Sequence, residues 1–136
     1  ISGKEKLKAI FKESVARPVQ EDVFTTAPDL GNNPRLLYSL FKETMAVAAP
    51  DYIQPIIEEG IADGSISADH PRELAELIIL VANIWMNPMI FGDSVDQTCG
   101  KISVFRQMMA GFGLDIVDDE IMERMRELAV AYQKNR

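Results

Sequence analysis

Hydrophobic residues recur at helical spacing along most of the chain, and residues 70–91 (HPRELAELIILVANIWMNPMIF) are apolar on nearly every side. One helical stripe of this segment is formed by Leu74, Leu77, Ile78, Val81 and Trp85. Leu80, Ile84 and Met86 are also apolar but lie on other sides of the same helix. Because a helix that is apolar all round must be covered all round, we expect one of two arrangements. The segment is either the central helix of a bundle, or it contacts its own core on one side and a second subunit on the other.

Five further segments show the pattern of an amphipathic helix. They are residues 4–16, 34–48, 51–63, 98–112 and 118–133. Asn33 and Pro34 mark one start, because Asn is a good cap and Pro fits the first helical position. Asp118 is expected to cap the last helix. Val23 and Phe24 indicate either a short helix or an apolar plug within a loop.

Prolines and glycines predict where these helices end or bend. Pro18 ends the first helix, because the residue before a proline avoids the helical region. Pro50 is expected to stop the helix of residues 34–48, and Pro55 to bend or restart the next one. Gly64 fits a helix C-cap. Pro88 is expected to kink the central helix near its end.

No segment alternates between polar and apolar residues as a strand does. The sequence therefore predicts an all-α fold, a bundle of about six helices with short connections. Its 136 residues indicate a single domain, residues 1–136, large enough to bury a core. The apolar run of residues 77–91 is too short and too interrupted for a membrane helix, which needs about 20 apolar residues. We expect no contact with a membrane.

Composition and charge narrow the possible partners. Apolar residues make up 47% and charged residues 26%, as in ordinary globular proteins. The net charge of −7 argues against direct binding of nucleic acid or an anionic membrane. The densest group of basic residues is Lys4, Lys6, Lys8 and Lys12, and these lysines fit the solvated face of an amphipathic helix. With one cysteine and no signal peptide ahead of the first helix, we expect a cytoplasmic protein without disulfides.

The sequence shows none of the residue patterns that are typical of catalytic or metal-binding sites. His70 is the single histidine, and its place before Pro71 at a helix start favours a capping or surface role. Cys99 beside Gly100 fits a packed thiol better than a nucleophile. Asp63, Asp69 and His70 are too few and too far apart for a zinc site. We predict no catalytic residues, no metal, no cofactor and no enzymatic activity.

Methionine and asparagine residues are the remaining indications of a binding site or an interface. The chain has seven methionines: Met45, Met86, Met89, Met108, Met109, Met122 and Met125. They either fill the core or line an adaptable apolar pocket. Asn83 and Asn87 continue a polar stripe from Glu76 on a buried helix, so their amides need partners. Those partners are a facing subunit, a ligand or other side chains of this chain.

Three features of residues 50–85 (PDYIQPIIEEGIADGSISADHPRELAELIILVANIW) occur together in one known family. The first is Glu59-Gly60 followed four residues later by Gly64. The second is the acidic loop of residues 69–71 leading into a helix that begins with proline. The third is the apolar helix, then a shorter helix, then Gly113-Leu114. With residues 36–45 (LLYSLFKETM), this pattern resembles the C-terminal regulatory domain of TetR-type (tetracycline-repressor-like) transcriptional regulators.

The resemblance implies a domain that binds a ligand and forms a homodimer. The helix-turn-helix of this family is not among these residues, so we expect it to precede residue 1. Residues 4–16 would then connect that DNA-binding head to the body, and DNA would be bound only through the head. The family pattern maps the dimer seam to residues 70–91 and 98–112. The helix of residues 118–133 is an addition that leaves open which pair forms the seam.

Helical wheels then assign the two surfaces of the domain. The residues expected to bind a small apolar or amphipathic effector are Phe41, Met45, Ile56, Trp85, Met89, Phe105 and Met109. The residues expected at the dimer interface are Glu76, Leu80, Asn83, Asn87, Lys101, Val104 and Met108. Effector binding would shift the dimer between DNA-competent and DNA-incompetent arrangements. The alternative is a standalone helical domain for protein–protein interaction, without a ligand pocket.

Overall fold

The structure is a computed structural model that describes residues 1–16 and 28–134, and every regular element in these two ranges is helical. The all-α prediction is therefore confirmed. In chain order the elements are α1 (Gly3–Ala16), the 3₁₀-helix η1 (Leu30–Asn32), α3 (Pro34–Glu43), the π-helix η2 (Thr44–Ile53), α4 (Gln54–Asp63), α5 (Pro71–Leu80), the π-helix η3 (Val81–Trp85), α6 (Pro88–Phe91), α7 (Val95–Gly111) and α8 (Asp119–Gln133). The predicted helix end at Pro18 and the segment around Val23 and Phe24 lie outside the described residues.

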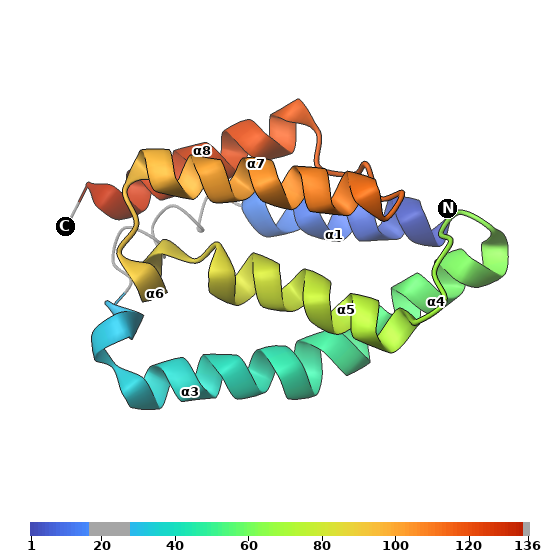
Figure 1. Cartoon of the computed structure of the whole chain (residues 1–136), viewed down its shortest axis with the longest axis horizontal. Coiled ribbons are helices and arrows are strands. Elements are labelled where there is room, and N and C mark those ends of the chain that lie inside the picture. The colour runs from blue at the N-terminus through green and yellow to red at the C-terminus, as the bar shows by residue number, and fades with distance from the viewer. Residues whose placement is uncertain (17–27, 135–136) are drawn as a thin grey trace.

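The helices are arranged around α5 and η3, as the apolar pattern predicts. In Figure 1, α3 and α4 lie along one side, α5 lies in the middle, and α7 lies on the other side with α1 and α8 behind it. The largest fully buried apolar side chains come from all of these layers: Leu7, Ile57, Ile78, Phe105, Met109, Leu114, Ile116 and Ile121. One continuous core therefore joins both halves of the chain.

The predicted stop at Pro50 is wrong. The helical run continues without a break from α3 through η2 into α4, and Pro50 lies inside the π-helix η2. A proline lacks the N–H that an α-helix requires and its ring clashes with the preceding turn. The wider π-turn accommodates this residue, so the chain passes it without ending the helix.

The central helix is shorter than the predicted segment of residues 70–91. It ends at Trp85, and Asn87 then caps the separate helix α6 by accepting a hydrogen bond from the Met89 N–H at 2.9 Å. Pro88 occupies the first position of α6. The proline therefore breaks the helix where a kink was expected.

Local signals fix the ends of the other helices. α7 begins at Val95, three residues before the predicted start, because Ser94 and Gln97 form a capping box. The Asp118 side chain caps α8 by accepting a bond from the Ile121 N–H at 2.8 Å, as predicted. Gly64 ends α4 with a φ of 84°, which also confirms its predicted role.

The start of α1 is held against the end of α4. A Cβ on Gly3 would overlap the backbone of Gly60, so the two helices touch through their main chains. The Gly3 N–H donates to the Asp63 carboxylate at 2.8 Å, and the Lys4 N–H donates to the Ser65 hydroxyl at 3.1 Å. The first turn of α1 is therefore capped by side chains about 60 residues away in the chain.

The α1 lysines do more than form a solvated face. Lys4, Lys8 and Lys12 pair with acidic residues near the start of α8, at N–O distances of 2.8, 3.2 and 3.8 Å. Lys6 pairs with Glu59 of α4 at 2.6 Å. These pairs are partly exposed, so each contributes little stability, but together they set the position of α1 between α4 and α8.

Candidate functional site

A partly open cavity of about 390 Å³ lies between the second half of α1 and the helices η3, α6, α7 and α8, and single residues of α3, η2 and α5 complete its wall. Its described lining residues are Ile10, Phe11, Ser14, Val15, Leu40, Ile53, Ile79, Ala82, Asn83, Met86, Asn87, Pro88, Met89, Thr98, Ile102, Met125, Leu128 and Ala129. The volume falls in the range of small-molecule sites, roughly 300–1,000 Å³. The cavity is therefore large enough for a small organic ligand.

The cavity wall is apolar and, among the described lining residues, carries no charged side chain. Its polar side chains are Ser14, Asn83, Asn87 and Thr98. Such a wall favours ligands with a large apolar body, because burying a charge without a partner is costly. The arrangement offers binding and orientation, and it offers no acid–base pair for catalysis.

Two of these polar side chains already have partners. Both ends of the Asn87 amide are occupied, since it donates to the Asn83 carbonyl at 3.1 Å and accepts from the Met89 N–H. Ser14 donates to the Phe11 carbonyl at 2.8 Å. These two residues therefore hold the local backbone at the ends of η3 and α1.

The other two have free hydrogen-bonding capacity. Thr98 is 3% exposed, and within the described part of the chain its hydroxyl has no hydrogen-bond partner. The Asn83 side-chain amide is half-buried and makes no hydrogen bond to any described residue, although the Asn83 carbonyl accepts from Asn87. Thr98 lies in the first turns of α7, and Asn83 lies in η3, which packs against α7.

The seven residues predicted to bind the effector do not lie together in the structure. Met89 lines the cavity. Phe105 and Met109 are fully buried in the core, whereas Met45 and Ile56 are half-buried and line no part of this cavity. Phe41 and Trp85 are exposed, at 45% and 37%. The described structure therefore brings only one of the seven predicted residues to the cavity wall.

The residues predicted for the dimer interface divide between two sides of η3 and α7. Asn83 and Asn87 line the cavity. Val104 is exposed on α7, and Leu80, Lys101 and Met108 are half-buried. Glu76 is half-buried on α5. The apolar members of the second group lie away from the cavity, because none of them lines it.

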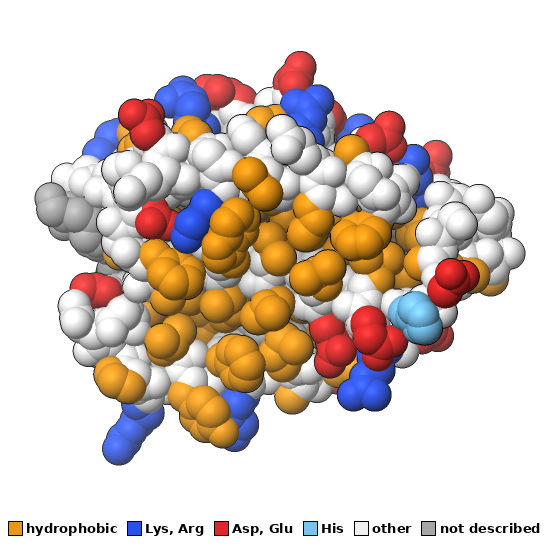
Figure 2. Space-filling model, viewed as in Figure 1, with side chains coloured by type: hydrophobic (Ala, Val, Ile, Leu, Met, Phe, Trp, Pro, Cys, Tyr) orange, Lys and Arg blue, Asp and Glu red, His pale blue; other side chains and the backbone are white. Residues whose placement is uncertain are grey.

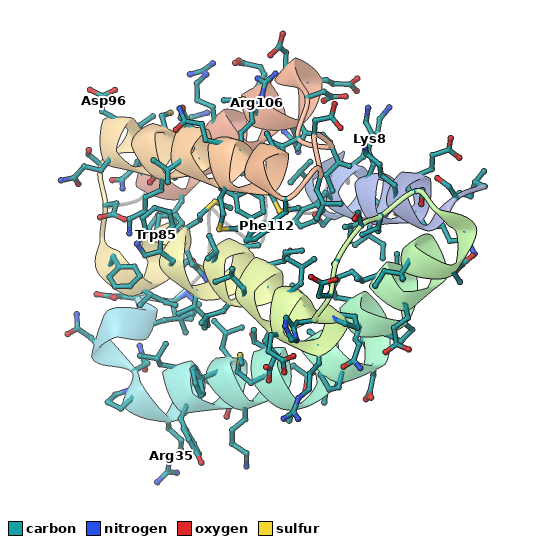
Figure 3. All side chains as sticks on the ribbon, turned by 45° about the vertical axis from the view of Figure 1, so that its right-hand side comes forward. Lys8, Arg35, Trp85, Asp96, Arg106 and Phe112 are labelled. Atoms are coloured by element: carbon teal, nitrogen blue, oxygen red, sulfur yellow. The ribbon has the colours of Figure 1, made fainter. Side chains whose placement is uncertain are left out.

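An exposed apolar surface covers the outer side of α5, η3, α6 and α7. We call it the α5–α7 face and define it by Leu77, Leu80, Ile84, Trp85, Phe91, Val104, Met108 and Phe112, all exposed or half-buried. Figure 2 shows hydrophobic side chains gathered over these helices, on the side that faces the viewer in Figure 1. In Figure 3, Trp85 lies beside the first half of α7, and Phe112 lies at its far end.

Lys101 joins the elements of this face at one edge. Its ammonium lies 2.7 Å from the Asp93 carboxylate and donates to the Trp85 carbonyl at 2.8 Å. It also lies 4.0 Å from the centre of the Phe91 ring and 5.2 Å from the centre of the Trp85 ring. Lys101 therefore positions η3 and α6 against α7, and its charge is balanced by Asp93.

The cavity residues that the sequence prediction missed come mainly from outside the central helix. Ile10, Phe11 and Val15 of α1, Thr98 and Ile102 of α7, and Leu128 of α8 all line it. Their apolar stripes were visible in the sequence, but the stripe of a helix does not say whether it meets packed neighbours or a gap. Thr98 had a usable signal, because it is a polar residue four positions before Ile102 on the buried side of α7.

Groups with shifted pKa values lie away from the cavity. Hydrogen bonds from the Ser65 hydroxyl and the Gly3 N–H lower the pKa of Asp63. The hydrogen bond and charge of Lys4 lower the pKa of Asp115, and the Ile121 N–H lowers that of Asp118. Pairing on α8 lowers the pKa of Glu123 and raises that of Arg126. In residues 1–16 and 28–134 no three His, Cys, Asp or Glu side chains cluster as metal ligands would.

Comparison with known proteins finds no matching family model, no matching curated protein and no matching solved structure. No helix in the described ranges has the length and apolar character needed to cross a bilayer. The cavity and the α5–α7 face are therefore the two structural features that bear on function.

Proposed function

We propose that this chain is the ligand-sensing and dimerisation domain of a TetR-type transcriptional regulator. Its cavity binds a small effector, its α5–α7 face pairs with a second copy, and the complex acts in the cytoplasm. Ligand binding is coupled to DNA release by a helix-turn-helix head that precedes residue 1 in the full regulator. Support comes from the sequence resemblance together with the arrangement of these two surfaces.

One observation carries the proposal: the same two helical elements serve both surfaces. η3 and α7 present Ala82, Asn83, Thr98 and Ile102 to the cavity, and they present Trp85 and Val104 outward. Monomeric proteins rarely expose large contiguous apolar surfaces, and such surfaces often mark interaction sites. A ligand that shifts η3 or α7 therefore acts directly on the proposed interface.

Helix α1 supplies the route from cavity to head. Its first turn is fixed to α4 through Gly3, Gly60 and Asp63, while Ile10 and Val15 near its other end line the cavity. Filling the cavity would move the second half of α1 about this fixed start. Any chain joined ahead of α1 would be reoriented by that rotation.

A charge placed on the α5–α7 face tests dimerisation. Val104→Arg is suitable because the valine is 51% exposed, so the monomer fold tolerates the longer side chain. An arginine buried without a partner at the interface should cost about 3 kcal/mol, or roughly a hundredfold in dimer affinity. Size-exclusion chromatography with light scattering should show a dimer of the 15.2 kDa chain and a monomeric variant.

Ser103→Arg is the matched control. Ser103 adjoins Val104 on α7 but lines a separate groove against α8, together with Cys99 and Arg126. The same added charge should leave the dimer intact there. Equal masses for the two variants, whether both monomeric or both dimeric, would contradict the assignment of the interface to the α5–α7 face.

The α5–α7 face taken alone also fits a standalone helical domain for protein–protein interaction. In that case the cavity has no ligand, and the surface contacts a different protein. A monomeric chain that binds no small apolar molecule would favour this alternative.

A further inference from the structure

The cavity wall contains hydrogen-bonding groups that the fold leaves unused. The Thr98 hydroxyl is buried without a partner in the described part of the chain, and the Asn83 amide is also free there. Most buried polar groups in proteins are hydrogen-bonded, so an unused one at a cavity wall needs an explanation. Small-molecule sites characteristically combine an apolar wall with a few polar groups that orient the ligand.

Charge at the wall restricts the ligand further. The described lining residues include no Lys, Arg, Asp or Glu, and the whole chain has a net charge of −7. A carboxylate or ammonium group placed beside Asn83 and Thr98 would lose water without gaining an ionic partner among the described lining residues. Lys101 contacts η3 through the Trp85 carbonyl, but it is paired with Asp93, and neither residue lines the cavity.

We infer that the cavity selects uncharged amphipathic molecules, with an apolar body and one neutral hydrogen-bonding head such as a hydroxyl, amide or ester. The body packs against Phe11, Ile79, Met86 and Ile102. The head bonds to Asn83 and Thr98 where η3 packs against α7. This inference rests on the proposed ligand-sensing function and narrows the class of its ligand.

A series of eight-carbon probes tests the inference on the unaltered chain. The probes are n-octane, 1-octanol, octanoate and octylammonium, and binding is measured at pH 7 by ligand-detected NMR and by thermal shift. We expect 1-octanol to bind at least tenfold more tightly than either charged probe. n-Octane is the more hydrophobic of the two neutral probes, so it serves as the reference whose binding depends on the apolar wall alone.

Two substitutions locate the head group. Thr98→Val keeps the side-chain shape, and Asn83→Leu keeps its approximate size, while each removes a hydrogen-bonding group. Each should weaken 1-octanol binding about fivefold to tenfold and leave n-octane binding unchanged. Thr44→Val is the matched control, because Thr44 also has a buried hydroxyl without a partner in the described part of the chain, but it does not line the cavity.

The outcomes separate this inference from the proposed function. Tight binding of octanoate or octylammonium would overturn the inference and still support a ligand site. 1-Octanol binding that is unchanged by both Thr98→Val and Asn83→Leu would also overturn it. Failure of all four probes to bind would count against the ligand-sensing function itself. If a variant does not fold, the comparison of probes on the unaltered chain remains decisive.

Discussion

At the scale of single residues, the threonine hydroxyls of Thr44 and Thr98 are unusual. Both side chains are buried, and within the described part of the chain neither hydroxyl has a hydrogen-bond partner. Thr44 lies where α3 passes into η2, and Thr98 lies at the cavity wall. A buried polar group without a partner lowers stability, so these two positions differ from the apolar core around them.

Thr44→Val should therefore stabilise the protein. The substitution preserves the shape of the side chain and removes the cost of burying an unpaired hydroxyl, for a gain of about 1 kcal/mol. Urea denaturation followed by circular dichroism measures the change. A loss of stability would mean that an ordered water or another group satisfies the hydroxyl in solution.

Acid stability depends on residues such as Asp63. Its pKa is lowered below the ordinary value of 3.8 by bonds from the Ser65 hydroxyl and the Gly3 N–H. A carboxyl whose pKa is lower in the folded state stabilises the fold above its unfolded pKa, and that contribution is lost as the pH falls through the folded pKa. Asp63 therefore contributes its full stabilisation above about pH 4.

Asp63→Asn should lower stability at pH 7, and the difference from the unaltered protein should shrink as the pH falls below 3.8. Thermal unfolding between pH 2.5 and 7, in buffers that keep both proteins soluble, measures the stability difference and its dependence on pH. A difference that stays constant over this range would show that the Asp63 charge does not hold the start of α1.

At the scale of elements, hydrophobic periodicity and capping signals predicted most of the helices. The amphipathic stripes located α1, α3, α4, α5, α7 and α8, and Asp118 and Gly64 act as the caps that their residue types indicate. The sequence prediction begins this helix at residue 98, whereas the Ser94–Gln97 capping box begins α7 at Val95. The capping box is readable in the sequence as a serine followed three residues later by a glutamine.

The π-helices explain why the site was harder to predict than the fold. A helical wheel assumes 3.6 residues per turn, whereas a π-turn is wider and shifts every following side chain around the helix axis. The wheel placed Trp85 inward on the stripe of Ile78 and Val81. At the end of η3, Trp85 is 37% exposed, whereas the next residue, Met86, is buried at 8% exposure. Nothing in the residue types of 81–85 indicates this wider turn.

The contact between α1 and α4 gives the element-scale prediction. Gly3→Ala should destabilise the protein by roughly 1–3 kcal/mol, because the new methyl group would overlap the Gly60 backbone. Hydrogen exchange should also become faster in the first turn of α1. Gly100→Ala is the control on α7, because a Cβ at this position meets nothing within 4 Å. This substitution should raise the stability by about 0.5–1 kcal/mol, because alanine favours a helix more than glycine does. A Gly3→Ala variant as stable as the parent would argue against close docking of α1.

At the scale of the whole molecule, the all-round apolar pattern of the central helix has a specific spatial meaning. One side of α5 is packed in the core, as Ala75 and Ile78 show, whereas Leu77 and Trp85 remain exposed. The sequence indicates that this helix needs cover on every side, and the described part of the chain covers it on one side. The sequence did not predict which residues line the cavity, because its wall is assembled from α1, α3, η2, the segment from α5 to α6, α7 and α8.

The central claim is that this domain forms a dimer and binds a neutral ligand within each subunit. A native mass spectrum of the purified chain, recorded with and without 1-octanol, tests both parts together. We expect a species at twice the chain mass of 15.2 kDa and an added mass of one alcohol per subunit. A monomer that retains no alcohol at any concentration would contradict it.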